Sequence, residues 1–78
     1  MRIDLFLKEA RIIKRRTIAK EYCERGLVLI NGKTAKPSSE VNNNDIVNIT
    51  FGEKKFDIKA VIELVGKNER ASYVRIEP

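Results

Sequence analysis

Basic side chains crowd one short stretch of this 78-residue chain. Five cations fall within ten residues, at Arg11, Lys14, Arg15, Arg16 and Lys20, and residues 10–20 contain no acid. Like charges at this density repel one another unless an anion binds among them. Arginine can grip a phosphate through two parallel hydrogen bonds, whereas lysine acts as a point charge. We therefore interpret the cluster as a phosphate-binding surface, the alternative being an ordinary solvated run of charge.

The charge of the chain is concentrated in its first half. The net charge is +5, yet residues 1–36 hold ten Lys and Arg against four acids, and residues 37–78 hold six against seven. Arg2 and Lys8 lie close to the cluster, and Lys33 and Lys36 would extend it if they lie beside the second helix. A balance this basic in a short chain predicts an anionic partner such as a nucleic acid.

Composition excludes several kinds of chemistry. The chain has no His, which rules out His-dependent acid–base catalysis and His metal ligands. A single Cys rules out an intramolecular disulfide and a multi-Cys zinc site, and four scattered Gly residues offer no phosphate-binding loop. The carboxylates show no spacing that supports paired acid–base catalysis. We expect no enzymatic activity, no cofactor and no bound metal.

Three further side chains could carry chemistry but fit the core better. Cys23 falls on the apolar face of a helix, where a small buried hydrophobe is expected rather than a nucleophile. Tyr22 and Tyr73 fit core positions with a polar tip near the surface, and base stacking is the weaker interpretation.

A lone thiol suits a reducing cytosol, and the sequence shows no targeting or membrane-spanning segment. A cytoplasmic location without membrane association follows.

Two helices must position the basic cluster. Apolar residues at positions 3, 6, 7 and 10 form one stripe of a first helix, with Asp4 in its first turn. A second helix is expected over residues 15–25, with Ile18, Ala19, Tyr22 and Cys23 on one face and Gly26 ending it. The connection at residues 11–14 should be held inward by one of its two Ile residues.

The pattern of the second half of the chain predicts strands. Aliphatic residues 27–30 precede Asn31-Gly32, a strong signal for a hairpin with a type I′ turn, and residues 33–35 would form the return strand. Further strands are expected at residues 46–51 and 54–64. A polar loop should follow at 66–70, and a last strand from Tyr73 should end at Pro78. The fold class is α+β: a single domain with two N-terminal helices packed on a small twisted antiparallel sheet of four to five strands.

An ordered set of motifs in this chain resembles the S4-type RNA-binding domain. The motifs are residues 2–7, Arg11, residues 14–20, residues 26–32, Val41 and residues 45–47. The resemblance covers roughly residues 1–52, with C-terminal strands at 53–78. It is strongest to the small stand-alone bacterial branch of heat-shock-protein-15-like proteins and ribosome-associated quality-control factors. Asn44 stands where the family usually has Gly, and the basic C-terminal extension of the heat-shock proteins is missing.

The resemblance implies a non-catalytic protein that binds structured RNA. Its expected partners are ribosomal RNA of the large subunit, tRNA and a ribosome-associated tailing factor, and it should act as a monomer that stabilises peptidyl-tRNA on obstructed large subunits. Shape rather than base sequence would select the RNA. Together with the basic stripe, the resemblance gives these expected RNA-binding residues: Arg2, Lys8, Arg11, Lys14, Arg15, Arg16, Lys20 and Lys33.

Three other functions remain open from the sequence. The chain could be a general ribosome-assembly or tRNA-binding factor, or a stand-alone relative of the RNA-binding module of an RNA-modifying enzyme. A duplex-DNA binder that uses the second helix for recognition is a weaker alternative, because that helix has few Asn, Gln or Ser residues to read bases.

Overall fold

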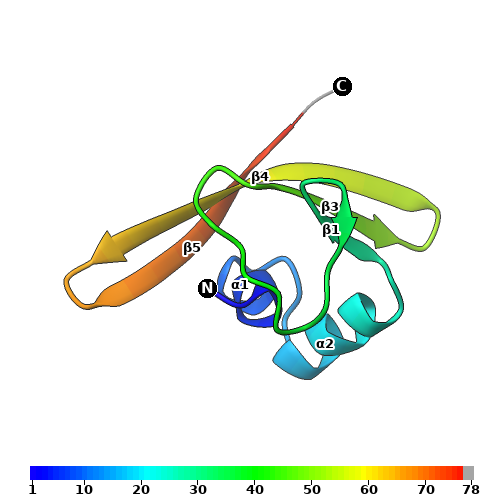
Figure 1. The fold of residues 1–78 in the computed structure, drawn as a ribbon, viewed down its shortest axis with the longest axis horizontal. Coiled ribbons are helices and arrows are strands. Elements are labelled where there is room, and N and C mark those ends of the chain that lie inside the picture. The colour runs from blue at the N-terminus through cyan, green and yellow to red at the C-terminus, as the bar shows by residue number, and fades with distance from the viewer. Residues whose placement is uncertain (77–78) are drawn as a thin grey trace.

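Two helices cover one face of a five-stranded antiparallel sheet in the computed structural model, which describes residues 1–76 (Figure 1). The helices are α1 (Ile3–Glu9) and α2 (Arg16–Glu24). The strands are β1 (Val28–Ile30), β2 (Lys33–Thr34), β3 (Ile46–Phe51), β4 (Lys54–Val65) and β5 (Asn68–Arg75), in the spatial order β2-β1-β3-β4-β5. The expected α+β architecture is confirmed. The expected end of the last strand at Pro78 lies outside the described residues.

The apolar stripe of α1 forms the centre of the core. Ile3, Phe6 and Leu7 are fully buried, and Ala10 is nearly so. In α2 the core packs on Ala19 and Cys23. The placement of Ile18 on this buried face is wrong, since its side chain is 39% exposed. Successive helical residues are rotated by about 100°, so Ile18 points away from the row that Ala19 shares with Cys23.

Two turns have the backbone geometry that their residues predict. Gly26 follows α2 with φ of +74°, and its N–H bonds to the carbonyl of Cys23, so the helix ends where a left-handed residue was expected. Asn31 and Gly32 both have positive φ, at 50° and 84°, which are the signs a type I′ hairpin turn requires. The turn joins β1 to β2, with Ile30 paired to Lys33.

The C-terminal hairpin differs from the expectation of a polar loop at residues 66–70. Val65 pairs with Asn68, so only residues 66 and 67 form the turn. β4 pairs with β3 over residues 54–59 and with β5 over residues 58–65, and its second half therefore leaves the main sheet as a projecting arm (Figure 1). Residues 63–70 of this arm are all exposed, which explains why strand residues here look like a loop.

The β5 strand also leaves Tyr73 less covered than a core position requires. Its side chain is 43% exposed, so the expectation that it belongs to the core is wrong. Tyr73 pairs with Ala60 at the edge strand of the sheet, where no further strand covers it in the described chain.

The N-terminus is attached to the segment that follows β2. The N–H of Ile3 bonds to the carbonyl of Ser39, and the N–H of Val41 bonds to the carbonyl of Met1, each at 2.8 Å. The N-terminal ammonium lies 2.6 Å from a carboxylate oxygen of Glu40. These bonds fix the start of α1, and with it the position of Arg2, relative to the rest of the domain.

Candidate nucleic-acid interface

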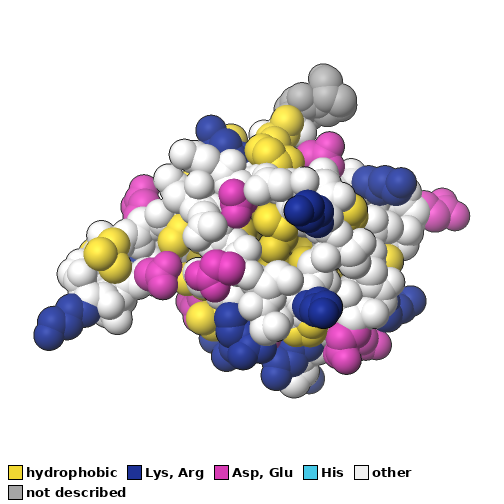
Figure 2. Space-filling view, viewed as in Figure 1, with side chains coloured by type: hydrophobic (Ala, Val, Ile, Leu, Met, Phe, Trp, Pro, Cys, Tyr) yellow, Lys and Arg dark blue, Asp and Glu magenta, His cyan; other side chains and the backbone are white. Residues whose placement is uncertain are grey.

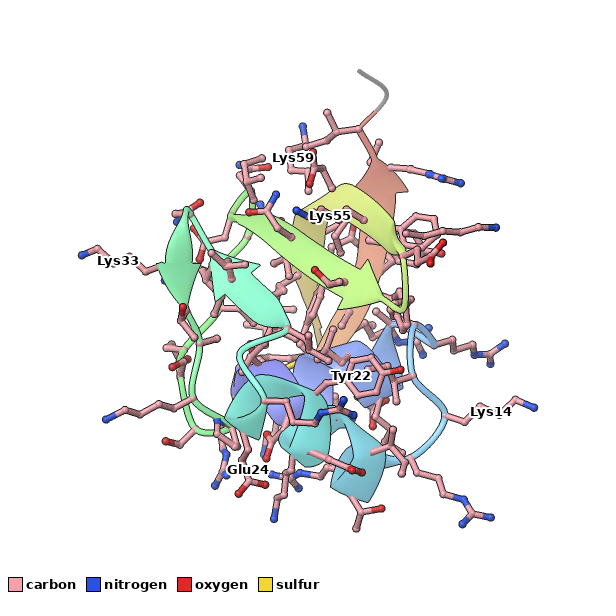
Figure 3. All side chains as sticks on the ribbon, turned by 90° about the vertical axis from the view of Figure 1, so that its right-hand side faces the viewer. Lys14, Tyr22, Glu24, Lys33, Lys55 and Lys59 are labelled. Atoms are coloured by element: carbon pink, nitrogen blue, oxygen red, sulfur yellow. The ribbon has the colours of Figure 1, made fainter. Side chains whose placement is uncertain are left out.

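The connection between α1 and α2 is a fixed loop that carries several cations. The N–H groups of Ile12 and Ile13 both bond to the carbonyl of Leu7 at 3.0 Å, and Ile13 is buried with 6% of its side chain exposed. The expected inward contact of this loop is therefore made chiefly by Ile13. Arg11 has a φ of 62°, which turns the chain sharply after α1. Lys14 projects into solvent from this loop (Figure 3).

The N-terminus of α2 opens directly onto the same cations. Arg15 is the N-cap residue, its side chain makes no capping hydrogen bond, and the first turn contains no acid. The first N–H groups of a helix have no partner within the helix and carry partial positive charge. Arg15 and Lys20 are exposed and Arg16 is half-buried. This end of α2 therefore adds backbone donors to a basic surface.

A buried carboxylate brings two arginines from different parts of the sequence together. Asp4 in α1 is fully buried, and its Oδ2 accepts a hydrogen bond from Nη2 of Arg2 at 3.1 Å. Nη2 of Arg16, at the start of α2, lies 3.5 Å from Oδ1, and Nε of Arg16 lies 3.5 Å from Oδ2. The N–H of Leu5 completes the set at 2.7 Å from Oδ1. We call the group formed by Arg2, Asp4 and Arg16 the arginine brace.

The prediction that no acid pairs with the cations of residues 10–20 is wrong for Arg16. Its partner is Asp4, which lies twelve residues earlier in the chain and is brought close by the packing of α1 on α2. A buried charge is costly unless it is paired and hydrogen-bonded, and Asp4 meets both conditions. The side chains of Arg2 and Arg16 stay 46% and 41% exposed, so both guanidinium groups are held at the surface.

The remaining expected site residues fall in more than one place. Figure 2 shows Lys and Arg side chains gathered along the lower edge of the molecule, over the two helices. Lys8 is exposed on α1 and lies 3.4 Å from Glu9, so its charge is locally offset. Lys14 and Lys33 project from opposite sides of the molecule (Figure 3). Arg2, Arg11, Lys14, Arg15, Arg16 and Lys20 share the helical layer, whereas Lys33 belongs to the β1–β2 hairpin.

Cys23 does not take part in this surface. Its side chain is buried on the side of α2 that faces the core. Burial, with smaller contributions from Asp4 and Glu24, raises the pKa of its thiol to about 11. The thiol is therefore protonated near neutral pH, which is the opposite of what a nucleophile needs. Among residues 1–76 no group of three His, Cys, Asp or Glu side chains is arranged to hold a metal ion. In that same range neither helix is long and apolar enough to cross a membrane.

Sequence reasoning missed the role of Asp4 and a row of aromatic rings. From the sequence, Asp4 is only a favourable charge in the first turn of a helix. Its position between Ile3 and Leu5, in an otherwise apolar helix start, is the signal that could have indicated burial. The rings of Tyr22 and Phe51 lie 5.4 Å apart and those of Phe51 and Phe56 lie 5.6 Å apart, and no local pattern indicates this row because it joins three elements.

A helical pair on one face of a small sheet, with basic residues at the start of the second helix, defines a small S4-type domain. The S4 domain family model matches residues 1–47. The chain is 43% identical over 79 residues to the RQC P-site tRNA stabilizing factor of Halalkalibacterium halodurans, and the alignment covers 99% of this chain and 90% of that protein. The chain belongs to the S4 domain family and, within it, to the group of proteins named RQC P-site tRNA stabilizing factor.

Two further comparisons agree with this assignment. The chain is 46% identical over 70 residues to the RQC P-site tRNA stabilizing factor of Listeria monocytogenes, covering 90% of this chain and 74% of that protein. Heat shock protein 15 of Vibrio cholerae, whose structure is described as trimeric, has a similar fold with a TM-score of 0.77 at 29% identity. That comparison covers 97% of this chain and 81% of the other. The resemblance seen in the sequence is confirmed.

Proposed function

We propose that this protein binds folded RNA without catalysing a reaction, and that it steadies peptidyl-tRNA on obstructed large ribosomal subunits during ribosome-associated quality control. The RNA partners are the tRNA and ribosomal RNA of the large subunit. The similarity over almost the whole chain to proteins named for stabilising a P-site tRNA supports this role. The protein acts in the cytoplasm as a monomer, beside a factor that adds a C-terminal tail to the stalled chain.

The observation that carries the proposal is the arginine brace. Asp4 holds two guanidinium groups, each with five N–H donors, in a fixed orientation at the surface of the helical layer. Donors that do not face Asp4 are available for phosphate oxygens, and an arginine fixed in advance loses less side-chain entropy when it binds. The brace therefore supports an RNA-binding surface that is organised before the RNA arrives.

The neighbouring cations extend this surface by charge. Lys14, Arg15 and Lys20 are exposed, and within residues 1–76 none of them forms a salt bridge. Each phosphate that such a residue contacts releases counterions, so the affinity should fall steeply with salt. Because these residues contact the backbone rather than base edges, the surface selects RNA by shape.

The test is a pair of triple variants with equal net charge. The first replaces Lys14, Arg15 and Lys20 by Gln, and the control replaces Lys55, Lys59 and Lys67, all exposed and outside the helical layer, by Gln. Lys55 and Lys59 lie on the far side of the sheet from the helices (Figure 3). We expect the first variant alone to lose tRNA affinity. The slope of log affinity against log salt concentration should flatten by about 2 to 3 units, because each of the three lost phosphate contacts contributes ~0.7 to ~0.9. Equal losses in both variants would show that net charge alone attracts the RNA.

Sedimentation of the protein with ribosomal fractions tests the biological role. Co-migration with free large subunits that carry peptidyl-tRNA supports the proposal. Co-migration with assembly intermediates would instead indicate a ribosome-assembly factor, and absence from all ribosomal particles would indicate a module that binds tRNA or DNA alone. Sedimentation equilibrium of the free protein tests the monomer, and a trimer would contradict it.

A further inference from the structure

A cavity of about 200 Å³ lies between the α1–α2 connection and the sheet. Its apolar part includes Ile12 from the connection, Phe51 from β3 and Phe56 from β4. An engineered cavity of about 150 Å³ holds a benzene ring, whereas pockets for drug-sized ligands measure roughly 300–1,000 Å³. The cavity therefore has room for one planar ring system and is too small for a large organic ligand.

The aromatic side chains of the cavity belong to a continuous row. Tyr22 on α2 packs against Phe51, and Phe51 meets the edge of Phe56. The guanidinium carbon of Arg75 on β5 then lies 4.7 Å from the centre of the Phe56 ring. Figure 3 shows Tyr22 between α2 and the sheet, on the side of the molecule from which Lys14 projects. The row thus runs from the basic helical layer to the edge strand.

Charge at the cavity favours an anion attached to an apolar ring. Arg11 and Arg75 line it together with the half-exposed Tyr73, and none of its lining residues in the described chain is acidic. Aromatic and arginine side chains are the groups on which unstacked RNA bases pack, and arginine also binds the adjoining phosphate. A nucleotide combines both features, because it joins a planar base to a phosphate.

We propose that this cavity receives one unstacked nucleobase of the bound RNA, with its phosphate held by Arg11 and Arg75 together. The inference rests on the proposed RNA-binding function and adds to it a contact with a single-stranded nucleotide. Arg11 also begins the basic stretch of residues 11–16, so an RNA strand can pass from that stretch into the cavity without crossing an acidic side chain of the lining. The bound RNA must then offer a loop, bulge or end beside its folded helix.

Adenosine 5′-monophosphate, ribose 5-phosphate and inorganic phosphate are the probes for this cavity. NMR titration of the intact chain should show adenosine monophosphate shifting the resonances of Phe51, Phe56 and Tyr73, with little effect from the two probes that lack a base. Arg75→Gln should weaken this response at least severalfold. Arg70→Gln is the matched control, since Arg70 lies on the same strand but on the opposite face, and it should leave the response unchanged. Equal shifts from all three probes would reduce the cavity to a simple anion site and overturn the proposal, as would no shift at all.

A second measurement separates this inference from the proposed function. Tyr73→Ser and Arg75→Gln should each lower tRNA affinity by about fivefold or more, the low end of what one base stack contributes. Val74→Ala is the control, because Val74 is exposed and follows Tyr73 on β5, so that its side chain lies on the opposite face of the strand, and it should leave tRNA affinity unchanged. If tRNA binding is unchanged in both cavity variants but lost in the Lys14, Arg15 and Lys20 variant, the cavity proposal fails and the proposed function stands. If tRNA does not bind the unaltered protein, the proposed function fails.

Discussion

Replacing Asp4 by Asn should reduce both stability and RNA affinity, although it makes the protein more basic. Asn has nearly the same shape, so the substitution removes the charge from the arginine brace without leaving a cavity. The net charge rises from +5 to +6. Attraction by net charge alone would therefore strengthen RNA binding, whereas loss of a prearranged arginine pair would weaken it. The sign of the change in affinity decides between the two.

The structure sets the expected size of the loss in stability. Hydrogen bonds to charged groups contribute about 1.5–3 kcal/mol each, and Asp4 faces one arginine at 3.1 Å and another at 3.5 Å. Both arginines are more than 40% exposed, so solvent screens part of this energy. A net loss of about 2 kcal/mol follows. In a domain of this size it corresponds to a fall in Tm of about 8–15 °C.

The loss in affinity follows from side-chain entropy. Fixing a long side chain on binding costs about 0.5–1.5 kcal/mol, and two arginines would bear this cost anew without Asp4, which lowers affinity by roughly tenfold. Thermal denaturation followed by circular dichroism gives the stability, and fluorescence anisotropy with labelled tRNA gives the affinity. Binding is measured at a temperature where both proteins are folded.

Asp57→Asn provides the matched control for this prediction. It changes the net charge by the same amount at an exposed site on β4, where the carboxylate accepts a hydrogen bond from Asn48 on the neighbouring strand. We expect it to leave tRNA affinity unchanged or slightly higher. An Asp4→Asn protein that is as stable as the original and binds tRNA more tightly would refute the role assigned to the arginine brace.

Three other predictions concern the stability of the helical part of the domain. Gly26→Val should lower the free energy of unfolding by about 1–2 kcal/mol in urea titrations. A β-carbon at this position meets no atom within 4 Å, so the cost comes from the left-handed backbone alone, and an unchanged urea midpoint would contradict the prediction. Burial raises the pKa of the Cys23 thiol to about 11 in the folded protein, against about 8.5 in the unfolded chain. The protonated thiol therefore contributes in full to the free energy of unfolding below about pH 8.5, and this contribution is lost as the pH rises toward 11. Over that pH range the free energy of unfolding should fall less steeply in Cys23→Ala, and identical slopes would argue against a buried thiol. Ile13→Ala should cost about 2–4 kcal/mol and weaken tRNA binding at temperatures where the variant stays folded, since Ile13 fixes the cationic loop; unchanged binding would show that the loop needs no such contact.

The elements that sequence reasoning found are those with local signals. The stripe at positions 3, 6, 7 and 10, the glycine after α2 and the Asn31-Gly32 turn each depend on residues that are neighbours in the chain. Local geometry decides such features, so periodicity and turn chemistry predict them. The basic cluster was visible for the same reason, since its members follow one another in sequence.

The features that sequence reasoning missed depend on residues far apart in the chain. The contact of Asp4 with Arg16 requires α1 and α2 to pack before the carboxylate has a partner. The cavity takes its lining from the α1–α2 connection and from three strands, so no window of the sequence contains it. The strand expected at residues 54–64 agrees with β4, and only the loop expected at 66–70 differs, since β5 already begins at Asn68. Hydrophobic alternation marks a strand only where one face is buried, and residues 66–70 are exposed on both faces.

The projecting arm has a consequence for how the domain opens. Its outer half, residues 63–70, contributes no residue to the buried core, and it is held by the pairing of β4 with β5 and by a 4.0 Å ion pair between Glu69 and the N-terminal ammonium. Separating these strands exposes little apolar surface, so it costs much less free energy than global unfolding. Amide protons of the outer arm should therefore exchange with solvent long before those of β3, through openings that leave the helices and their cations in place.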